Sequence, residues 1–303
     1  MSKPLAPLAL FTYNRPTLTR QTLHALANNP LATQTVVYIF SDGPKPNTSQ
    51  ENLTKIQQTR EIISESYPFA QTNIILRNQN LGLAQSILSG VSEIIQKHGK
   101  IIVLEDDLIP SPFFLQYMND ALNLYESEDK VASIHAYTYP VPQTLPNTFF
   151  LRGADCWGWA TWKRAWNLIN TDANYLLQTI QNQNLNKLFT FNNTYPYTQM
   201  LKNQAESKIS SWAILWYASM FLENKLTLYP AKSLIKNAGT DGDGTHVRKT
   251  NKFNTEALTQ PINIKPIPIQ ESVEARQAFE MYFNSIKEPL LQKIIHRIQK
   301  WLK

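Results

Sequence analysis

Short apolar runs alternate with helix-periodic stretches over the N-terminal third of the chain. The apolar residues within each run are consecutive, which is typical of strands buried on both faces of a sheet. The stretches between them place Leu or Ile at helical spacing, and Gly99 marks the end of the last one. Strands that alternate with helices predict a mostly parallel sheet covered on both faces. The expected strands are 8–12, 36–40, 73–77 and 101–104, and the expected helices are 17–26, 49–66 and 83–97.

The pattern is less regular after Pro110. The stretch from about 168 to 201 is rich in Asn and Gln, and it predicts helices with surface loops. Trp162 and Trp166 are four residues apart, which predicts that both lie on the core face of one helix. The other expected elements are helices at 111–125, at 209–222 and from 271 onward, and strands at 131–135, 149–152 and 226–229.

The composition is that of a globular protein with a modest positive charge. The 303 residues include 29 Lys and Arg against 23 Asp and Glu, which suits an anionic partner such as a nucleotide or a phospholipid surface. The positive charge is spread thinly except near the C-terminus, so we expect no nucleic-acid binding. The lone Cys156 precludes an internal disulfide, and the N-terminus shows no signal-peptide pattern. No apolar run approaches the roughly 20 residues that span a bilayer, so we expect a cytoplasmic protein.

Three adjacent carboxylates, Glu105, Asp106 and Asp107, follow the apolar strand at 101–104. Their mutual repulsion gains nothing for the fold, so we expect a positive group to meet them. Open α/β sheets bind ligands at the carboxyl ends of their strands, and hard divalent cations prefer oxygen ligands. The sequence therefore predicts a cation here. An acidic surface turn that closes a core strand is the alternative.

Two segments of the second half are candidates for contacts with a sugar or a phosphate. Trp157 and Trp159 flank Gly158, which permits close approach of the backbone, and they would form an apolar wall for a sugar ring. The loop at 237–246 is too rich in Gly and Asp to pack by itself. It would fold over a phosphate or a metal, with His246 as a donor or ligand. A flexible surface turn is the alternative for this loop.

Residues 289–303 form an amphipathic pattern. Apolar side chains recur at helical spacing on one side, and Lys, Arg and His populate the other. One interpretation is a helix within 287–303 that binds an anionic membrane surface. A helix that docks on the domain or on a partner fits the same pattern, and both interpretations stay open.

The order of the motifs resembles that of GT-A glycosyltransferases. The chain is most similar to bacterial sugar transferases related to N-acetylglucosaminyltransferase I, which carries Glu-Asp-Asp where most relatives carry Asp-x-Asp. The Trp-rich segments and the loop at 237–246 extend the resemblance to about residues 5 to 250. The motifs of the first half are Tyr-Asn-Arg-Pro at 13–16, Ser-Asp-Gly at 41–43, Arg77, Asn-Leu-Gly-Leu at 80–83 and Glu-Asp-Asp at 105–107.

The resemblance implies an α/β fold of the GT-A type. Residues 1–110 would form a Rossmann-like nucleotide-sugar-binding half, 111–260 a contiguous acceptor-binding half, and 261–303 a C-terminal helical extension. The implied reaction is an inverting transfer of a hexosyl or N-acetylhexosaminyl group from a UDP-sugar to a hydroxyl of a glycan or lipid-linked glycan, in surface polysaccharide synthesis. Such an enzyme would be cytoplasmic or peripheral on the inner face of the cytoplasmic membrane.

The resemblance also assigns roles to single residues. Asp107 would be the direct ligand of Mn²⁺ (or Mg²⁺), and diphosphate oxygens and water would complete the coordination. Asp42 would accept a hydrogen bond from the uracil imide, and Asp106 would contact the ribose. The nucleotide-sugar pocket would comprise Thr12, Tyr13, Arg15, Asp42, Arg77, Asn80, Glu105 and Asp106, and Trp157, Trp159 and His246 would contact the sugars.

The general base is less evident than the metal ligand. Relatives place an acidic residue directly after the Trp that starts the buried helix, and that position is Ala213 here. Glu206 is the first candidate for the base that takes the proton of the acceptor hydroxyl, and Asp155 is the second. Asp241 and Asp243 in the loop are further alternatives.

Two other functions fit parts of the sequence. A sugar nucleotidyltransferase also pairs an α/β layer with a carboxylate-held metal. It would carry a Gly-rich phosphate loop after the first strand, where this chain has Tyr-Asn-Arg-Pro at 13–16. A catalytically silent carbohydrate-binding protein that retained the fold is the alternative suggested by Ala213.

Overall fold

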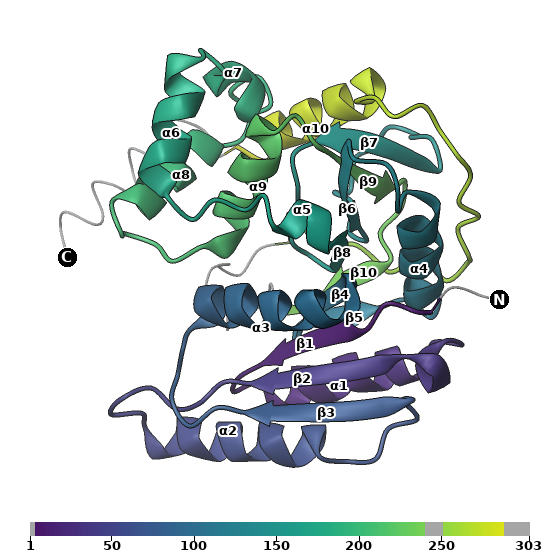
Figure 1. The fold of residues 1–303 in the computed structure, drawn as a ribbon, viewed down its shortest axis with the longest axis vertical. Coiled ribbons are helices and arrows are strands. Elements are labelled where there is room, and N and C mark those ends of the chain that lie inside the picture. Colours follow the sequence, from purple (N-terminus) through teal and green to yellow (C-terminus); the bar gives the residue numbers. More distant parts are fainter. Residues whose placement is uncertain (1–3, 240–250, 288–303) are drawn as a thin grey trace.

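The computed structural model describes residues 4–239 and 251–287 (Figure 1). They form the mixed α/β fold predicted from the sequence, in which strands and helices alternate through the N-terminal half. This half consists of β1 (Leu8–Thr12), α1 (Pro16–Ala27), the short 3₁₀ helix η1 (Ala32–Gln34), β2 (Val36–Ser41), α2 (Gln50–Ile63), β3 (Gln71–Leu76), α3 (Leu83–His98), β4 (Lys100–Glu105) and β5 (Leu108–Pro110).

The second half continues from the same sheet. It has more helices than strands, and its helices are short between residues 163 and 205. Its elements are α4 (Phe114–Leu124), β6 (Val131–His135), β7 (Thr148–Arg152), β8 (Trp159–Trp162), α5 (Lys163–Trp166), α6 (Ala173–Asn182), α7 (Asn186–Phe189), α8 (Tyr197–Ala205), α9 (Trp212–Leu222), β9 (Leu226–Pro230), β10 (Ile235–Asn237) and α10 (Val273–Ser285).

One eight-stranded sheet joins the two halves. Its strand order is β3-β2-β1-β4-β8-β6-β9-β7, and β10 and β5 form a separate two-stranded sheet. The first four strands are parallel, whereas β8 is antiparallel to both β4 and β6. Helices α1, α2 and α4 cover one face of the sheet, and α3 and the Trp-rich side of α9 pack on the other. The sheet therefore runs without a break across the two predicted halves.

Local sequence signals set the boundaries of the N-terminal helices. Pro16 occupies the first turn of α1, where its missing N–H is not needed. The Ser49 side chain caps α2 by accepting a hydrogen bond from the backbone N–H of Asn52. Gly99 ends α3 in the left-handed conformation with φ of 77° and donates to the carbonyl of Ile95. These predicted helices are confirmed, with boundaries that differ by a few residues.

The tryptophans of the second half form a cluster in the core and correct two predictions. Trp159 is only 1% exposed, and its ring centroid lies 5.1 Å from that of Trp212 and 5.6 Å from that of Trp166. The prediction that Trp159 contacts a sugar is therefore wrong, because its ring faces the protein interior. Trp162 ends strand β8 and is not in the same helix as Trp166, since α5 starts at Lys163.

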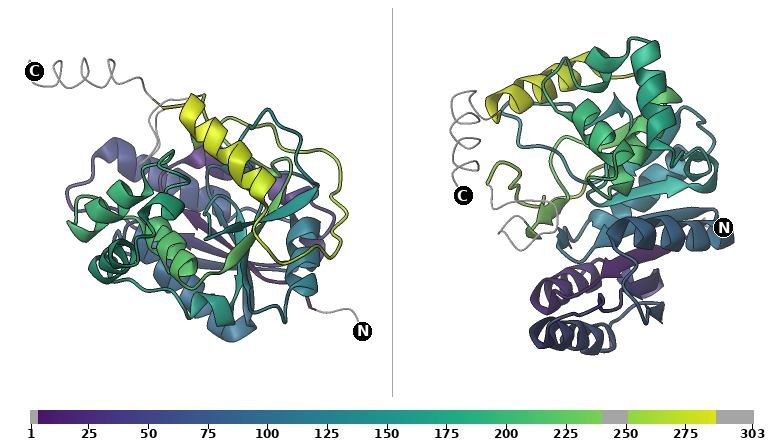
Figure 2. Two further views of the ribbon diagram at one scale, coloured as in Figure 1. Left: turned by 90° about the horizontal axis from the view of Figure 1, so that it is seen from above. Right: turned by 90° about the vertical axis from the view of Figure 1, so that its left-hand side faces the viewer.

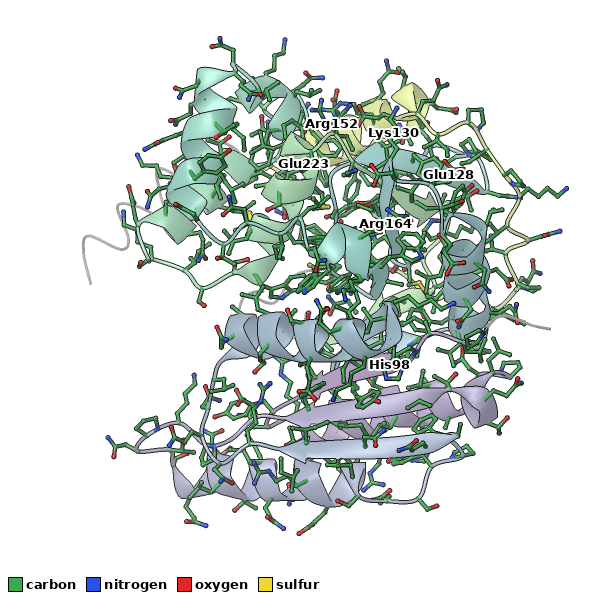
Figure 3. The ribbon with its side chains drawn as sticks, viewed as in Figure 1. His98, Glu128, Lys130, Arg152, Arg164 and Glu223 are labelled. Atoms are coloured by element: carbon green, nitrogen blue, oxygen red, sulfur yellow. The ribbon has the colours of Figure 1, made fainter. Side chains whose placement is uncertain are left out.

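An arginine fastens β8 and α5 to neighbouring segments. Arg164 donates to the carbonyl oxygens of Val131 at 2.8 Å and Tyr125 at 3.1 Å (Figure 3). Its guanidinium also lies over the ring of Trp162, at 4.4 Å from the centroid. Arg164 thus ties the end of β8 to the segment between α4 and β6.

Helix α10 lies across the second half of the molecule, as both views of Figure 2 show. Phe279 and Phe283 of this helix are buried against Tyr139, with ring centroids 5.2 and 4.8 Å apart. A basic helix was predicted within residues 287–303. Of these residues, 288–303 lie outside the described part of the chain. Within the described ranges, no helix is both long and apolar enough to span a membrane.

The buried position of Trp159 predicts a stability effect. Replacing Trp159 with Ala should lower the free energy of unfolding by roughly 3–5 kcal/mol, because a large cavity would remain in the Trp cluster. The half-buried Trp157 provides the matched control, and Trp157→Ala should cost clearly less. Urea unfolding followed by tryptophan fluorescence measures both. Equal losses in the two variants would contradict this placement of Trp159.

Candidate active site

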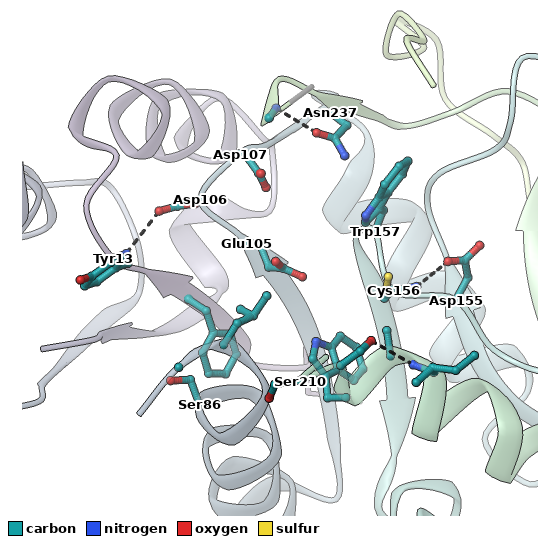
Figure 4. A pocket seen from close by; sticks show the side chains of 18 of the residues that line it. Tyr13, Ser86, Glu105, Asp106, Asp107, Asp155, Cys156, Trp157, Ser210 and Asn237 are labelled. Carbon is teal, nitrogen blue, oxygen red and sulfur yellow. Dashed lines mark hydrogen bonds between the residues drawn. The ribbon is translucent and has the colours of Figure 1, made fainter. Parts of the chain in front are cut away.

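A cavity of about 650 Å³ opens at the carboxyl ends of β1, β2 and β4 (Figure 4). Its volume lies in the range of pockets that hold small molecules or cofactors. Both halves of the chain contribute to its wall. The polar and charged lining residues include Thr12, Tyr13, Asn14, Arg15, Asp42, Lys45, Asn80, Ser86, Glu105, Asp106, Asp107, Asp155, Cys156, Ser210, Ser211 and Asn237, and the aromatic ones include Tyr139, Trp157, Tyr195, Tyr197, Trp212 and Phe253.

The carboxylates that follow β4 face one arginine. Arg15 Nη1 lies 2.7 Å from Asp107 Oδ2 and 3.7 Å from Asp106 Oδ1. The backbone N–H of Tyr13 donates to Asp106 Oδ2 at 3.3 Å. Burial lowers the pKa of Arg15, but the charges of Asp106 and Asp107 outweigh this effect and leave the pKa raised. The end of β1 and the start of α1 are thereby tied to the end of β4.

Among the described residues, Arg15 is the one cation paired with these carboxylates, and one guanidinium does not neutralise three of them. Burial, and then the charges of the neighbouring aspartates, raise the pKa of Glu105 to about 8. Burial and the charge of Asp107 likewise raise the pKa of Asp106 to about 7. Burial is the first cause of both shifts, and the repulsion between the carboxylates, which an additional cation would relieve, adds to it.

The residues at this strand end fit a hard divalent cation that has few protein ligands. Across residues 4–239 and 251–287, no group of three or more His, Cys, Asp or Glu side chains is arranged to hold a metal ion. Asp107 lies at the cavity wall beside Asp106, so both could offer oxygen ligands. Mg²⁺-like ions commonly use one or two carboxylates together with substrate phosphate, and this donor set is of that kind.

The segment from Asn237 to Gly239 packs directly on Asp107. Strand β10 pairs with β5, so that Asn237 lies opposite Leu108, and the N–H of Ala238 donates to the carbonyl oxygen of Asp107 at 2.8 Å. A Cβ atom on Gly239 would collide with Asp107 Oδ2, so a larger residue at this position would displace the Asp107 side chain. The candidates Asp241, Asp243 and His246 lie outside the described residues.

The turn after β2 forms the opposite end of the polar wall. Asp42 is 7% exposed and accepts hydrogen bonds from the backbone N–H groups of Gly43, Leu81 and Gly82 at 2.9–3.2 Å. Asn80 Nδ2 donates to the carbonyl oxygen of Gly43 at 3.0 Å. The predicted nucleotide residues Asp42 and Asn80 therefore lie together in the wall, and their hydrogen bonds join the turns after β2 and β3.

Arg77 is not part of the cavity wall, contrary to prediction. Its guanidinium donates to Ser86 Oγ at 2.5 Å and Ser89 Oγ at 3.2 Å, both on α3. It also lies over the ring of Phe40, 5.4 Å from the centroid. Arg77 therefore supports the wall from behind, because Ser86 and Phe40, which it contacts, both line the cavity.

The second half contributes a carboxylate to the facing wall. Asp155 Oδ2 accepts a hydrogen bond from the Tyr139 hydroxyl at 3.4 Å, and Oδ1 accepts one from the N–H of Cys156 at 2.9 Å. The N–H of Trp157 donates to Nε2 of the buried His135 at 3.1 Å. Figure 4 shows Asp155 and Trp157 across the cavity from Glu105. The predicted sugar contact Trp157 and the second base candidate thus share one wall.

The topology explains why these two walls meet. Strand β8 is antiparallel to β4, and Trp159 at its start pairs with Val103 near the end of β4. The residues just before β8 must therefore lie at the same edge of the sheet as Glu105 and Asp107. This arrangement follows from the strand direction, and it places Asp155 within the cavity.

Glu206, the first base candidate, does not line the cavity. It follows the last residue of α8, its side chain is 38% exposed, and its Oε2 lies 2.5 Å from Lys208 Nζ. The hydrogen bond from Lys208 lowers the pKa of Glu206, which weakens it as a proton acceptor. This position corrects the prediction made from chain distance alone. Ala213 does line the cavity, at the start of α9.

Several lining residues were not predicted from the sequence. Tyr139 belongs to a Pro-punctuated loop, and Tyr195 and Tyr197 flank Pro196 in the Asn-rich segment. A pair of aromatic residues around a proline in a polar stretch was a signal for a surface that binds a ligand. Lys45 carried no such signal, because it is a single polar residue near a turn, whereas Asn237 is the first residue of the predicted loop at 237–246 without having been given a role of its own.

Comparisons with known proteins add little. No family model matches the chain, and no curated protein matches it. Solved structures overlap only partly: the mannosyltransferase PcManGT from Pyrobaculum calidifontis, in complex with GDP-Man and Mn²⁺, has 12% identity and a TM-score of 0.34 over 46% of this chain and 37% of its own. A UDP-glucose pyrophosphorylase complexed with UDP-glucose has 12% identity and a TM-score of 0.37 over 75% of this chain and 90% of its own. A cytidylyltransferase from Leptospira borgpetersenii has 11% identity and a TM-score of 0.30 over 54% of this chain and 62% of its own. These values are too low to carry an argument about activity.

The raised pKa values of Glu105 and Asp106 predict that cation binding expels protons. A cation favours the ionised form of both groups, so Mn²⁺ affinity should rise as the pH increases from about 6 through about 8 and level off above about 9. Calorimetric titration with Mn²⁺ in buffers of different ionisation enthalpy measures the number of protons released near neutral pH, because the observed heat then depends on the buffer. An affinity that is independent of pH over this interval would contradict the assignment.

Proposed function

We propose that this protein is a metal-dependent glycosyltransferase of the GT-A type that uses a UDP-sugar as donor. The observation that supports the proposal is a single cavity with two chemically different walls. One wall holds the carboxylates after β4, and the other holds Asp155 and Trp157. A transfer between two bound molecules needs such an arrangement, with one wall for the leaving group and one for the acceptor.

The nucleotide would bind along the ends of β1 and β2. Thr12, Tyr13, Asp42 and Asn80 line this part of the cavity and supply polar atoms for a base and a ribose. Arg15 lies next to Asp107 and would contact the diphosphate. Ligands of open α/β sheets bind at the same carboxyl edge.

Asp107, with Asp106 beside it, would hold Mn²⁺ or Mg²⁺. A bound divalent cation neutralises the charge that develops on a departing nucleoside diphosphate. Arg15 would add a second positive charge at the same position. Trp157 would place an apolar ring against the sugar.

Asp155 is the group best suited to accept the acceptor's proton. Burial, and then the charge of Asp155, raise the pKa of Tyr139, Tyr195 and Tyr197, so these phenols stay protonated at neutral pH. The same causes raise the pKa of the Cys156 thiol. Asp155 is therefore the proton acceptor on this wall among the described residues. It would take the proton of the attacking hydroxyl as that oxygen approaches the face of the sugar opposite the leaving group, which gives inversion.

The acceptor would be a hydroxyl of a glycan or a lipid-linked glycan, consistent with the aromatic lining near Asp155. Binding of residues 287–303 to an anionic inner membrane surface is part of the same proposal, since it would place the enzyme beside a lipid-linked acceptor. A cytoplasmic location follows from both.

The nature of the product tests the proposed reaction. Incubation with UDP-sugars and Mn²⁺ should release UDP, slowly by hydrolysis and faster with a suitable acceptor. Replacing Asp107 with Asn, or adding EDTA, should reduce the rate by at least about 100-fold, because the charge on the diphosphate is no longer neutralised.

The same assay separates the alternatives. A sugar nucleotidyltransferase would join UTP and a sugar 1-phosphate to form a UDP-sugar and pyrophosphate, or catalyse the reverse reaction. It would not release UDP. A silent carbohydrate-binding protein would bind sugar and release neither product. Full turnover by Asp107→Asn in EDTA would refute the metal assignment.

Replacing Asp155 with Asn tests the base. The amide keeps the oxygen that accepts from the N–H of Cys156 but cannot take a proton, so kcat should fall by at least about 100-fold while UDP-sugar affinity is retained. Glu206→Gln is the matched acid-to-amide control outside the cavity and should retain wild-type kcat. The reverse pattern would restore Glu206 as the base and remove Asp155.

A further inference from the structure

The side chain of Asn237 is placed between the two walls of the cavity. It is the last residue of β10, it is 6% exposed, and it lines the cavity. Its pairing with Leu108 keeps it next to Asp107. Figure 4 shows its amide between Asp107 and Trp157. None of the roles given above uses this side chain.

The hydrogen bonds of Asn237 fix the orientation of its amide group. Oδ1 accepts from the N–H of Gly239 at 2.9 Å, which forms a turn over two residues. Nδ2 must then point the other way, toward the cavity, as Figure 4 shows. Among the described residues Nδ2 has no hydrogen-bond partner. A buried amide therefore presents two free N–H donors to the cavity.

We propose that Asn237 Nδ2 donates a hydrogen bond to an oxygen of the transferred sugar, and so helps to select the donor. The proposal rests on the proposed function, which places the diphosphate at Asp107 and the sugar against Trp157. A sugar hydroxyl or acetamido oxygen would lie between them. The turn alone does not require an amide, since Asp or Ser supplies the same acceptor for the N–H of Gly239. The donor group is thus available for a ligand.

Two variants remove the donor and keep the turn. Asn237→Asp preserves the size of the side chain and adds a negative charge, whereas Asn237→Ser is neutral but too short to reach the sugar. Lys236→Gln is the control: it changes the charge of the same strand by the same one unit, at an exposed side chain paired with Glu256. The three proteins and the wild type are titrated with UDP, UDP-glucose and UDP-N-acetylglucosamine in the presence of Mn²⁺.

The informative quantity is the ratio of the dissociation constants for UDP and for the UDP-sugar. If a substitution affects the binding of the metal or of the nucleotide part, it changes the dissociation constants for UDP and for the UDP-sugar alike. Such an effect cancels in the ratio. The wild type should prefer at least one UDP-sugar over UDP. Asn237→Ser and Asn237→Asp should each lose about fivefold or more of that preference, the effect of one lost hydrogen bond. Lys236→Gln should retain it.

The outcomes separate the two proposals. If the wild type binds neither UDP nor a UDP-sugar, the proposed function fails and this inference fails with it. If the wild type prefers a UDP-sugar and Asn237→Ser keeps the same ratio, the contact of Asn237 is refuted while the proposed function stands. Should Asn237→Asp fail to fold, the neutral Asn237→Ser decides alone. A loss that is only structural lowers the affinities for UDP and for the UDP-sugar together and leaves their ratio unchanged. Thermal unfolding of each variant detects such a loss independently.

Discussion

The structure around the cavity depends on three adjacent carboxylates at the end of a buried strand. Strand β4 lies between β1 and β8 and ends at Glu105, and β5, which pairs with β10, starts at Leu108, so the turn that carries Asp106 and Asp107 is held at both ends. Their repulsion is opposed by Arg15 and by the backbone N–H of Tyr13, which brings the end of β1 and the start of α1 to the same point. Among the described residues, one guanidinium is paired with these three acids, so this part of the strand end keeps a surplus of negative charge. Burial first, and then that surplus, raise the pKa of Glu105 and of Asp106, and the surplus fits a divalent cation.

A single glycine separates the cavity wall from the core in the second half. Gly158 has φ of 66°, a left-handed conformation that side chains disfavour, and its carbonyl accepts from the N–H of Ala136 at 2.8 Å. A Cβ at Gly158 would lie 2.7 Å from the side chain of Ile235. The backbone change at this residue sends Trp157 to the cavity and Trp159 to the core. Two similar residues therefore have different roles because of the glycine between them.

The sequence predicted the first half better than the second for identifiable physical reasons. In the first half, consecutive apolar strands and capped helices follow local rules, so the strand ends and their polar residues could be placed from the pattern. In the second half, β8 is a short antiparallel insertion whose partners lie far away in the chain. Local patterns carry no information about such pairing, and this explains the errors at Trp159 and Trp162. Glu206 was chosen by its distance along the chain, which does not determine distance in space.

Asp42 illustrates how a residue can be placed correctly while its chemistry needs revision. The resemblance to GT-A glycosyltransferases implied that Asp42 accepts a hydrogen bond from the uracil imide, and the structure places Asp42 in the cavity wall. However, three backbone N–H groups already donate to its two oxygens. A carboxylate offers about four acceptor positions, so at most one position is left for a base. The larger effect of Asp42 is then to hold Leu81 and Gly82, the two residues before α3, against the turn after β2. If a nucleotide base binds here, its recognition depends on the shape that these hydrogen bonds impose as much as on the carboxylate itself.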